Sequence, residues 1–530
     1  MDYLKSPKFL VTAGLIIIML ASFLLMIFSS QGDSLTVDEK VHISSGYLHV
    51  WKGDYTFNSE HPPLLNDLAG LFTKIARPNL PAVPLSNFQA KDQWQYGDLF
   101  FYHAGNSAHA DNDVDKIIFW ARLPFILLTL GLIYLVFLWA KTIFSAKAGL
   151  VAAALVGFSP NILAHGRLAT TDFGLAFFFV LSIWLLRKYI LKSTWPNAVW
   201  LGLSVGLVFL SKFSGLLILP LIGLGLLYFW VVKRPKFAAS FGQFLLILIS
   251  ASLLSWLVYA FSMRAELSSP VFFGPIDKFL QGYAILVDHN TIGHWNYLNG
   301  QISFSGWWYY FPLVLWYKMT VPALILLGLA IIFPQKKKKF LENLLIILPP
   351  VLFLGMSLTS RIDIGIRHIL PVLPFIFIFV SGLVDTKNLF LKPIVTGLVI
   401  LHVVFGILAY PHFIAYFNQI AGGPTGGINH LIDSNLDWNQ NMKRFAAYAQ
   451  KRNIDKVYTF CWDQEAFRYY GVEAEFLPIT PVNGVVVICA HQLKIKYGYD
   501  FSWIEKYPPD DIVAHTMYVW RFDKNNIQFN

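Results

Sequence analysis

The chain has 530 residues, of which 56% are hydrophobic and only 14% are charged, with a mean hydropathy of +0.53. Soluble domains carry about 25% charged residues, so this composition excludes a soluble protein. The net charge of +10 does not indicate a nucleic-acid partner, because residues 412–530 hold 11 basic and 12 acidic residues, whereas the apolar residues 1–411 hold 30 and 19.

Residues 1–411 predict an all-α polytopic membrane module of about eleven apolar helices, each able to cross roughly 30 Å of hydrocarbon. The predicted spans are 9–28, 117–139, 148–165, 172–187, 196–211, 213–232, 240–261, 307–333, 340–357, 368–384 and 393–411. The first span is long, and no clear small-residue cleavage site follows it, so it is expected to stay as a helix rather than a cleaved signal peptide.

Basic residues are concentrated in the connectors on one side of these spans. That side holds 16 bases and the acids Asp2, Glu342 and Asp385, whereas the opposite side holds 14 bases and 16 acids. The bases are Lys5, Lys8, Lys141, Lys147, Arg187, Lys188, Lys192, Lys233, Arg234, Lys236, Lys336 to Lys339, Lys387 and Lys392. The positive-inside rule makes this side cytoplasmic. The quartet Lys336–Lys339 is expected to set topology, with a lipid-binding patch as the alternative.

An odd number of spans places the C-terminal domain outside the cell, together with the long loops 29–116 and 262–306. The cytoplasmic connectors are short by comparison. Chemistry or binding is therefore expected on the extracytoplasmic face.

The first external loop opens with two adjacent acids, Asp38 and Glu39, close to the end of the first span. Acids near a membrane surface are costly unless they have partners or a function. At helical spacing, Asp38 and His42 share one face. The alternative is a pair of helix N-terminal acids that complement the helix dipole.

The same loop continues with Glu60 and His61, followed by Pro62-Pro63-Leu64. The proline pair fixes a rigid turn at the start of the apolar segment 64–76, which would hold Glu60 and His61 at the interface. Taken alone, this pattern is a turn and the start of a re-entrant helix.

Together, these two stretches resemble protein O-mannosyltransferases and their bacterial relatives, and more distantly the lipid A aminoarabinose transferases. Further matching motifs occur along the membrane part and in the tail: Ala121–Pro124, Thr170–Asp172, Ser211–Phe213, Trp308–Tyr310 leading to Lys318 and Pro322, Arg367–Pro371, and Asp433–Trp438. The resemblance implies the GT-C fold and a glycosyltransferase whose sugar donor is a polyprenyl phosphate.

The sequence departs from the eukaryotic members at one motif. Those proteins have Gly-Lys after His-Pro-Pro-Leu, whereas this chain has Leu65-Asn66, and it lacks their inserted β-trefoil domain. In the tail, Trp438 is followed by Asn439-Gln440, where bacterial members usually have Gly-Gln. A protein acceptor therefore does not follow from the resemblance, and glycan and lipid acceptors stay open.

The resemblance implies that Asp38 is the base that takes the proton of the acceptor hydroxyl, with inversion at the anomeric carbon. Glu39 would orient the acceptor or Asp38. Asp172 faces the same side of the membrane and could contact the acceptor or the donor sugar.

The leaving group is a lipid phosphate, and cations must neutralise the negative charge that develops on it. The candidates are Arg367, His368, Arg122, Arg167, Lys212, Lys318 and His61, with His42 and Glu60 as further site residues. Arg367-His368 matches the family motif residue by residue. The alternative for these cations is snorkelling from helix ends or pairing with acids. Lys318 falls inside an apolar run, which favours a functional role.

No metal site has a diagnostic spacing. Asp38, His42 and His49 form one conceivable group, and His109, Asp111 and Asp113 form another. We expect no cofactor; a divalent cation is possible, but the sequence does not indicate one.

Residues 412–530 predict a small α/β domain, with an amphipathic helix over 439–452 and buried strands at 456–461 and 485–489. Cys461 and Cys489 lie in these strands; a disulfide is possible in an external domain, but two buried free thiols are favoured.

In the same domain, Asp433 and Asp437 are expected to be a helix cap and a solvent-facing acid rather than ligands. Trp438 and Trp462 could stack on a sugar or lie buried. The domain would bind the acceptor or cover the site.

Two other classes of protein fit this sequence less well than a transferase does. A secondary transporter would place its polar residues at mid-membrane on broken helices, often in inverted repeats, neither of which we find. A non-enzymatic scaffold of the cell envelope would not need acids and cations on one face. The sugar is undetermined, with mannose as the family-weighted expectation, and the short loops place the protein in a prokaryotic cell membrane.

Overall fold

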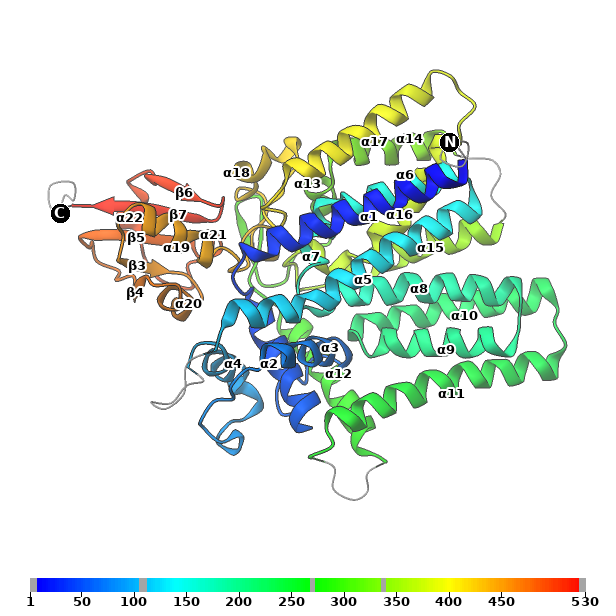
Figure 1. Ribbon diagram of the computed structural model, residues 1–530, viewed down its shortest axis with the longest axis horizontal. Coiled ribbons are helices and arrows are strands. Elements are labelled where there is room, and N and C mark those ends of the chain that lie inside the picture. The colour runs from blue at the N-terminus through cyan, green and yellow to red at the C-terminus, as the bar shows by residue number, and fades with distance from the viewer. Residues whose placement is uncertain (1–6, 104–111, 267–271, 335–339, 524–530) are drawn as a thin grey trace.

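The computed structural model describes residues 7–103, 112–266, 272–334 and 340–523. It consists of a bundle of long helices with a small β-sheet domain at one end (Figure 1). α1 begins at the opposite end of the bundle (Figure 1). The end that carries the β-sheet is called the sheet end below.

Among the described residues, seven helical segments are long and apolar enough to cross a membrane, and an eighth is a bent pair. The seven are α1 (Pro7–Gln31), α5 (Val114–Ile143), α8 (Thr171–Leu191), α10 (Ile218–Tyr228) with its flanking turns Phe213–Leu217 and Phe229–Lys233, α11 (Phe237–Ser262), α15 (Phe340–Ser357) and α17 (Leu391–Leu408). The pair is α13 (Tyr310–Lys318) and α14 (Val321–Ile332), and the chain bends by 115° between these two helices. The protein is therefore a multi-pass membrane protein of the predicted helical class.

The count of eleven full-length spans is not confirmed. Three of the predicted spans are short helices instead: α6 (Ala146–Gly157), α9 (Trp195–Phe209) and α16 (Val372–Ser381). The predicted span 148–165 divides because Pro160 starts a new helix, α7 (Pro160–His165). Hydropathy does not register such breaks, because the residues on both sides of them are equally apolar.

The end of the bundle opposite the sheet holds charges that the sequence analysis assigns to the cytoplasm. Arg187 at the end of α8 donates to both oxygens of Glu342 at the start of α15, at 2.7 and 2.8 Å. This contact places the two predicted cytoplasmic connectors together. Six residues of that set lie outside the described residues: Asp2, Lys5 and Lys336–Lys339.

The segment that follows α1 forms the helices α2 (Val37–Lys52), α3 (Leu64–Thr73) and α4 (Gln93–Tyr102) at the sheet end of the bundle (Figure 1). α2 and α3 cross with their backbones in contact. A Cβ on Gly46 would lie 1.8 Å from the Asn66 carbonyl oxygen, and one on Gly70 would lie 2.1 Å from Gly46. Only glycine permits this crossing, which fixes α2 and therefore Asp38 against the bundle.

The second long loop forms α12 (Gly274–Ile292) and a two-stranded hairpin of β1 (Asn296–Leu298) and β2 (Gln301–Ser303). After α17, residues 412–441 pack on the bundle and contain only one short helix, α18 (Gly423–Gly427), and two 3₁₀ turns. Lys318 binds three backbone carbonyls of this segment, so the segment is held to the membrane module.

The first helix of the α/β fold is α19 (Met442–Lys451), which starts three residues later than the helix predicted over 439–452. The sheet of this fold has the order β4-β3-β5-β7-β6, with β4, β3 and β5 parallel and the remaining pairs antiparallel. The strands are β3 (Lys456–Phe460), β4 (Glu473–Phe476), β5 (Gly484–Cys489), β6 (Asp511–Val513) and β7 (Met517–Phe522). The other helices are α20 (Gln464–Tyr469), α21 (Ala490–Lys494) and α22 (Ser502–Glu505). The predicted α/β class and both predicted strands are confirmed.

The prediction of free thiols is wrong, because Cys461 and Cys489 form a disulfide. β3 and β5 are parallel neighbours, and the last residue pair in their register is Phe460 with Ile488. The next residues along the chain are the two cysteines, whose Cα atoms lie 5.2 Å apart. The sequence did not reveal that the two strands are adjacent.

Candidate active site

Arg367 lies at the centre of a charged cluster at the sheet end of the bundle. It belongs to the 3₁₀ turn Ile366–Ile369, which precedes α16. Its Nη1 lies 2.7 Å from Oδ2 of Asp38 and 3.3 Å from Oδ2 of Asp172. Burial lowers the pKa of Arg367, but the two carboxylates raise it above its usual value, so the guanidinium stays charged.

The second cation of the cluster is Lys212, at the start of the turn that precedes α10. Its Nζ lies 2.5 Å from Oδ1 of Asp172. Asp172 is in the first turn of α8, where the helix dipole favours a carboxylate. Asp172 therefore holds Lys212 and Arg367 together, one on each oxygen.

The two carboxylates of the cluster differ in accessibility. The side chain of Asp172 is 1% exposed and that of Asp38 is 24% exposed. Asp38 is in the first turn of α2, and Arg367 engages its Oδ2. Asp38 is thus the carboxylate of this cluster that an incoming molecule can reach.

Three histidines surround the cluster: His42 on α2, His61 in the loop before α3, and His368 beside Arg367. The His42 and His61 rings lie 5.1 Å apart. Burial lowers the pKa of all three; nearby His42 and Lys212 lower that of His61 further, and Lys212 and Arg367 lower that of His368. These imidazoles are therefore neutral at pH 7 and can exchange hydrogen bonds without adding charge.

The tail segment closes the cluster from the other side. The Nε of Arg367 donates to Oγ of Ser434 at 3.0 Å, and Cζ lies 4.3 Å from the ring centroid of Trp438. Trp438 is only 2% exposed, so it packs on the cation rather than presenting a face to a sugar. Sequence reasoning did not identify Ser434 as a partner of Arg367, and the motif Asp433–Trp438 was the only signal.

Glu39 and Arg122 form a separate, fully buried pair. The carboxylate accepts from Nε and Nη2 of Arg122 at 2.7 and 2.6 Å, and from the backbone N–H groups of Thr36 and Ala169. Burial raises the pKa of Glu39, but Arg122 and these hydrogen bonds lower it below the usual value. The pair joins α2 to α5 and thereby positions the start of α2.

Arg167 and Lys318 also have internal partners. Nη1 of Arg167 lies 2.5 Å from Asp33, which also pairs with Arg444 of the tail domain at 2.6 Å. Nζ of Lys318 donates to the carbonyls of Ile414, Tyr416 and Asn435 at 2.6 to 2.8 Å. Both side chains are about 1% exposed. Each therefore attaches the C-terminal part of the chain to the bundle.

Glu60 accepts a hydrogen bond from the Gln93 side chain at 2.8 Å, which ties the loop before α3 to α4.

His42 Nδ1 lies 2.8 Å from Asn66 and 2.9 Å from Asn58. The nearby His49 instead pairs with Asp67. His42 and His49 of the first conceivable metal group therefore have different partners.

Within the described residues, no three His, Cys, Asp or Glu side chains lie close enough together to hold a metal ion. Of the second conceivable group, Asp113 caps α5 through the N–H of Lys116. His109 and Asp111 lie outside the described residues.

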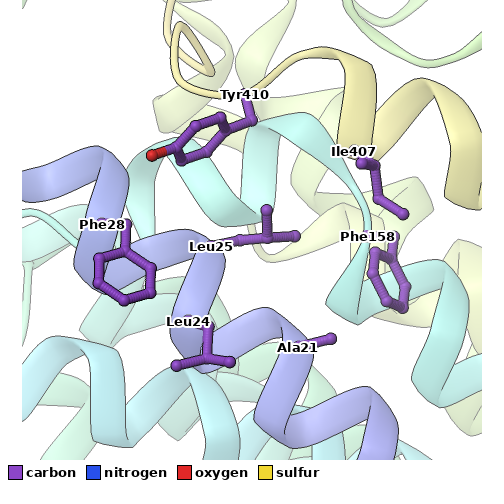
Figure 2. A pocket seen from close by; sticks show the side chains of 7 residues that line it. All are labelled: Ala21, Leu24, Leu25, Phe28, Phe158, Ile407 and Tyr410. Atoms are coloured by element: carbon purple, nitrogen blue, oxygen red, sulfur yellow. The ribbon is translucent and has the colours of Figure 1, made fainter.

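One apolar cavity of about 350 Å³ lies on the outside of α1. Its lining residues are Ala21, Leu24, Leu25, Phe28, Phe158, Ile407 and Tyr410. Figure 2 shows Ile407, at the end of α17, and Tyr410, just after it, facing the α1 side chains. It is lined by no charged residue, so it is not a site of polar chemistry; its lining matches hydrocarbon.

Comparisons with known proteins agree with this architecture. Residues 114–259 match the family model described as dolichyl-phosphate-mannose-protein mannosyltransferase. No curated protein sequence matches the chain. The apo crystal structure of ArnT from Cupriavidus metallidurans is 13% identical, with a TM-score of 0.50 over 96% of this chain and 97% of that one.

Two further structures are similar to a lower degree. ArnT from the same organism bound to undecaprenyl phosphate has a TM-score of 0.49 at 13% identity, over 96% and 98% of the two chains. The Archaeoglobus fulgidus oligosaccharyltransferase tethered with an acceptor peptide has a TM-score of 0.46 at 13% identity, over 100% of this chain and 76% of that one. The likeness to apo ArnT and the matched family model confirm the predicted GT-C fold and the resemblance to O-mannosyltransferases.

Proposed function

We propose that this protein transfers a sugar from a polyprenyl-phosphate-linked donor to a hydroxyl group of an acceptor, on the extracytoplasmic face of a prokaryotic cell membrane. One observation carries the proposal: Asp38 is the accessible carboxylate of a cluster whose other members, Asp172, Arg367 and Lys212, are buried or nearly so. The GT-C fold and the partial match to mannosyltransferases support the same activity.

Asp38 is the proposed base. The acceptor oxygen attacks the anomeric carbon, its proton moves to Asp38, and the bond from that carbon to the phosphate oxygen breaks with both electrons going to the phosphate. Attack from the face opposite the leaving group inverts the anomeric centre. Arg367 holds one carboxylate oxygen at 2.7 Å and so fixes the orientation of Asp38.

Arg367 and Lys212 are the proposed partners of the phosphate. Before the reaction, their two positive charges are balanced by Asp38 and Asp172. When Asp38 takes the proton, it loses its negative charge, and the cluster becomes positive by one unit while the leaving phosphate becomes more negative by one unit. The cluster therefore stabilises charge that develops only during transfer, which accelerates the chemical step.

His61 and His368 are the proposed hydrogen-bond partners of the phosphate or the sugar. Both rings lie near Lys212 and are neutral at pH 7. Glu39, Arg122, Arg167, Glu60 and Lys318 have no such role in this proposal, because their partners within the protein engage their charged or polar groups. His42 would support His61 from α2.

The orientation of the chain is also part of the proposal. The excess of bases in the connectors far from the sheet favours a cytoplasmic N-terminus and an extracytoplasmic C-terminal domain. The Cys461–Cys489 disulfide supports this orientation, because disulfides persist in oxidising compartments. The sugar is proposed to be mannose by family likeness, although other hexoses and pentoses fit the same cluster.

The test is transfer by the purified full-length protein in proteoliposomes, with radiolabelled polyprenyl-phosphate-mannose as donor and an envelope extract from a deletion strain as acceptor. We expect label in the extract with the wild-type protein and a loss of at least about hundredfold with Asp38→Asn. Asp54→Asn is the matched control, because Asp54 is a half-buried loop acid bonded to the backbone of Thr56. Full transfer by Asp38→Asn would show that Asp38 is not the base.

A further inference from the structure

The sheet of the C-terminal domain has a topological switch point next to the charged cluster. β3 is the first strand of this sheet along the chain; β4 pairs on one side of it and β5 on the other, all parallel. The connections that leave β3 and β4 therefore run in opposite directions. In open α/β sheets, ligands bind beyond the carboxyl ends of strands at such a point.

Half-exposed aromatic side chains lie at that position. Trp462, two residues after β3, is 39% exposed, and its ring centroid lies 4.1 Å from that of His491, which follows β5. Tyr497 is 36% exposed, and its hydroxyl lies 2.7 Å from Nε2 of His491. Trp295, immediately before β1, meets Tyr497 edge to face at 5.9 Å.

Buried polar side chains contact these rings or adjoin them in the chain. His491 is 1% exposed, and its Nδ1 lies 3.6 Å from Oδ2 of Asp433. The adjacent residue Gln492 is 2% exposed, and neither atom of its amide has a hydrogen-bond partner among the described residues. A buried polar side chain is costly unless it is satisfied, so these groups favour a ligand that brings hydroxyls.

These residues adjoin the charged cluster. Asp433 is the neighbour of Ser434, which binds Arg367, and the charges of Arg367 and Asp38 both act on Asp433. His294, beside Trp295, acts electrostatically on Asp433, His491 and His368. A molecule that reaches Asp38 from the sheet end therefore also lies close to the carboxyl ends of β3 and β5.

We propose that Trp295, Trp462, Tyr497, His491 and Asp433, here named the aromatic edge, bind a saccharide unit of the acceptor. This inference rests on the proposed transfer reaction and names its acceptor class as a glycan or glycolipid headgroup. A pyranose ring presents a face of positively polarised C–H groups, which matches the negative face of an aromatic ring. Its hydroxyls are directed outward, toward imidazole and carboxyl groups.

A peptide acceptor would use a different part of the sheet. Extended peptides pair their backbone with an exposed edge strand. The edge strands here are β4 and β6, whereas the aromatic edge follows the central strands β3 and β5. The placement of the aromatic rings therefore favours a saccharide.

The test uses the purified full-length protein in detergent, fluorescently labelled, on an array of bacterial envelope oligosaccharides and on an array of Ser/Thr-containing peptides. We expect binding to at least one oligosaccharide and not to the peptides. Trp462→Ala should weaken this binding about tenfold or more, whereas Trp462→Phe should retain most of it, because a smaller ring still stacks.

Two controls separate this inference from the transfer reaction. Trp94→Ala should bind normally, because Trp94 is 42% exposed in the first turn of α4 and is not part of the aromatic edge. The array assay itself is the second control, because it contains no polyprenyl-phosphate donor and therefore measures binding without transfer. If the protein binds the oligosaccharide but does not transfer sugar, the proposed reaction is contradicted and the saccharide site is not.

Three results would overturn the inference: no oligosaccharide binds, the Trp462→Ala variant binds as tightly as the wild-type protein, or Trp462-dependent binding goes to peptides. If Trp462→Ala is unstable, Tyr497→Phe replaces it. That variant removes only the hydroxyl bonded to His491. Unchanged saccharide binding by Tyr497→Phe would likewise contradict a role of Tyr497 and His491 in binding.

Discussion

The indole of Trp438 lies over the guanidinium of Arg367, with the ring centroid 4.3 Å from Cζ. The two residues are far apart in the chain, since one follows the last spanning helix, whereas the other precedes α16. The cation of the proposed site is therefore held between carboxylates of the membrane module and an aromatic ring of the C-terminal segment.

Trp438→Ala and Ser434→Ala should lower kcat more than they raise KM for the donor. Both side chains fix Arg367, and a displaced guanidinium stabilises the leaving phosphate less well; a hydrogen bond to a charged group is worth about 1.5–3 kcal/mol. Trp438→Phe should restore most of kcat, because it keeps a ring over the cation. Steady-state kinetics in proteoliposomes would show the split, and a pure KM effect would argue against positioning.

Asp172→Asn should destabilise the protein and abolish transfer. The neutral amide would leave Lys212 and Arg367 with one carboxylate between them, and removing one partner of a buried pair costs about 3–5 kcal/mol. Thermal unfolding in detergent measures the loss. Asp385→Asn is the control, since Asp385 is exposed and accepts a hydrogen bond from Ser145. A wild-type melting temperature for Asp172→Asn would contradict the pairing.

Glu39→Gln should behave differently from the change at its neighbour Asp38. The neutral amide of the new side chain could not balance the charge of Arg122, which is fully buried, so the start of α2 should lose its anchor at a cost of about 3–5 kcal/mol. We expect a low yield of folded protein from Glu39→Gln and a normal yield of inactive protein from Asp38→Asn. Size-exclusion profiles would compare them, and equal profiles would refute the structural role of Glu39.

Reduction of the Cys461–Cys489 disulfide should destabilise the C-terminal domain. The bond closes a loop with a sequence separation of 28 residues, for which a stabilisation of about 3–4 kcal/mol is expected. Protein isolated from membranes should resist maleimide labelling until it is unfolded and reduced. Labelling of both thiols in unfolded, unreduced protein would mean that the bond does not form in the cell.

Asp437→Asn should stabilise the protein increasingly as pH rises from about 4 to about 7. Burial raises the pKa of Asp437 to about 7, so the folded state holds a proton that the unfolded state has already released, and stability falls over this interval. The asparagine variant lacks this loss, on the order of 1.4 kcal/mol for each pH unit crossed.

Melting temperatures of both proteins across a range from about pH 4 to about pH 9 would measure the difference. The gap should stop widening above about pH 7, once the wild-type Asp437 is ionised in both states. Burial lowers the pKa of nearby His491 to about 3, which affects both proteins alike and cancels in the difference. A constant gap would show that Asp437 is ionised throughout.

The motifs at Asp38, Asp172, Lys212 and Arg367 could be found from the sequence because each lies at the end of an apolar segment on the same predicted side. Their proximity follows from topology alone, since helix ends on one face of a bundle are brought together. The separate role of Glu39 could not be found, because two adjacent acids look alike until Arg122 is seen beside one of them.

Hydropathy alone predicted neither the helix break at Pro160 nor the partners of Lys318. The apolar run around Pro160 predicted one span, but the proline begins a second helix. Lys318 looked functional because it interrupts an apolar run, and its three carbonyl partners come from residues about 100 positions later. Long-range contacts of this kind leave no local pattern.

The hydrogen bonds from Val37 N–H to the Trp438 carbonyl and from Ser34 N–H to the Gln440 carbonyl impose a sequence of events on biosynthesis. The Ser34 hydroxyl also donates to the carbonyl of Asn439, 405 residues later in the chain. A ribosome covers that length in about 20 to 80 s. During that time the segment before Asp38 has been made, but the chain that holds it has not. Until residues 438–440 are made, a nascent chain therefore lacks the hydrogen bonds that hold the segment before Asp38, and under the proposed function it should be inactive.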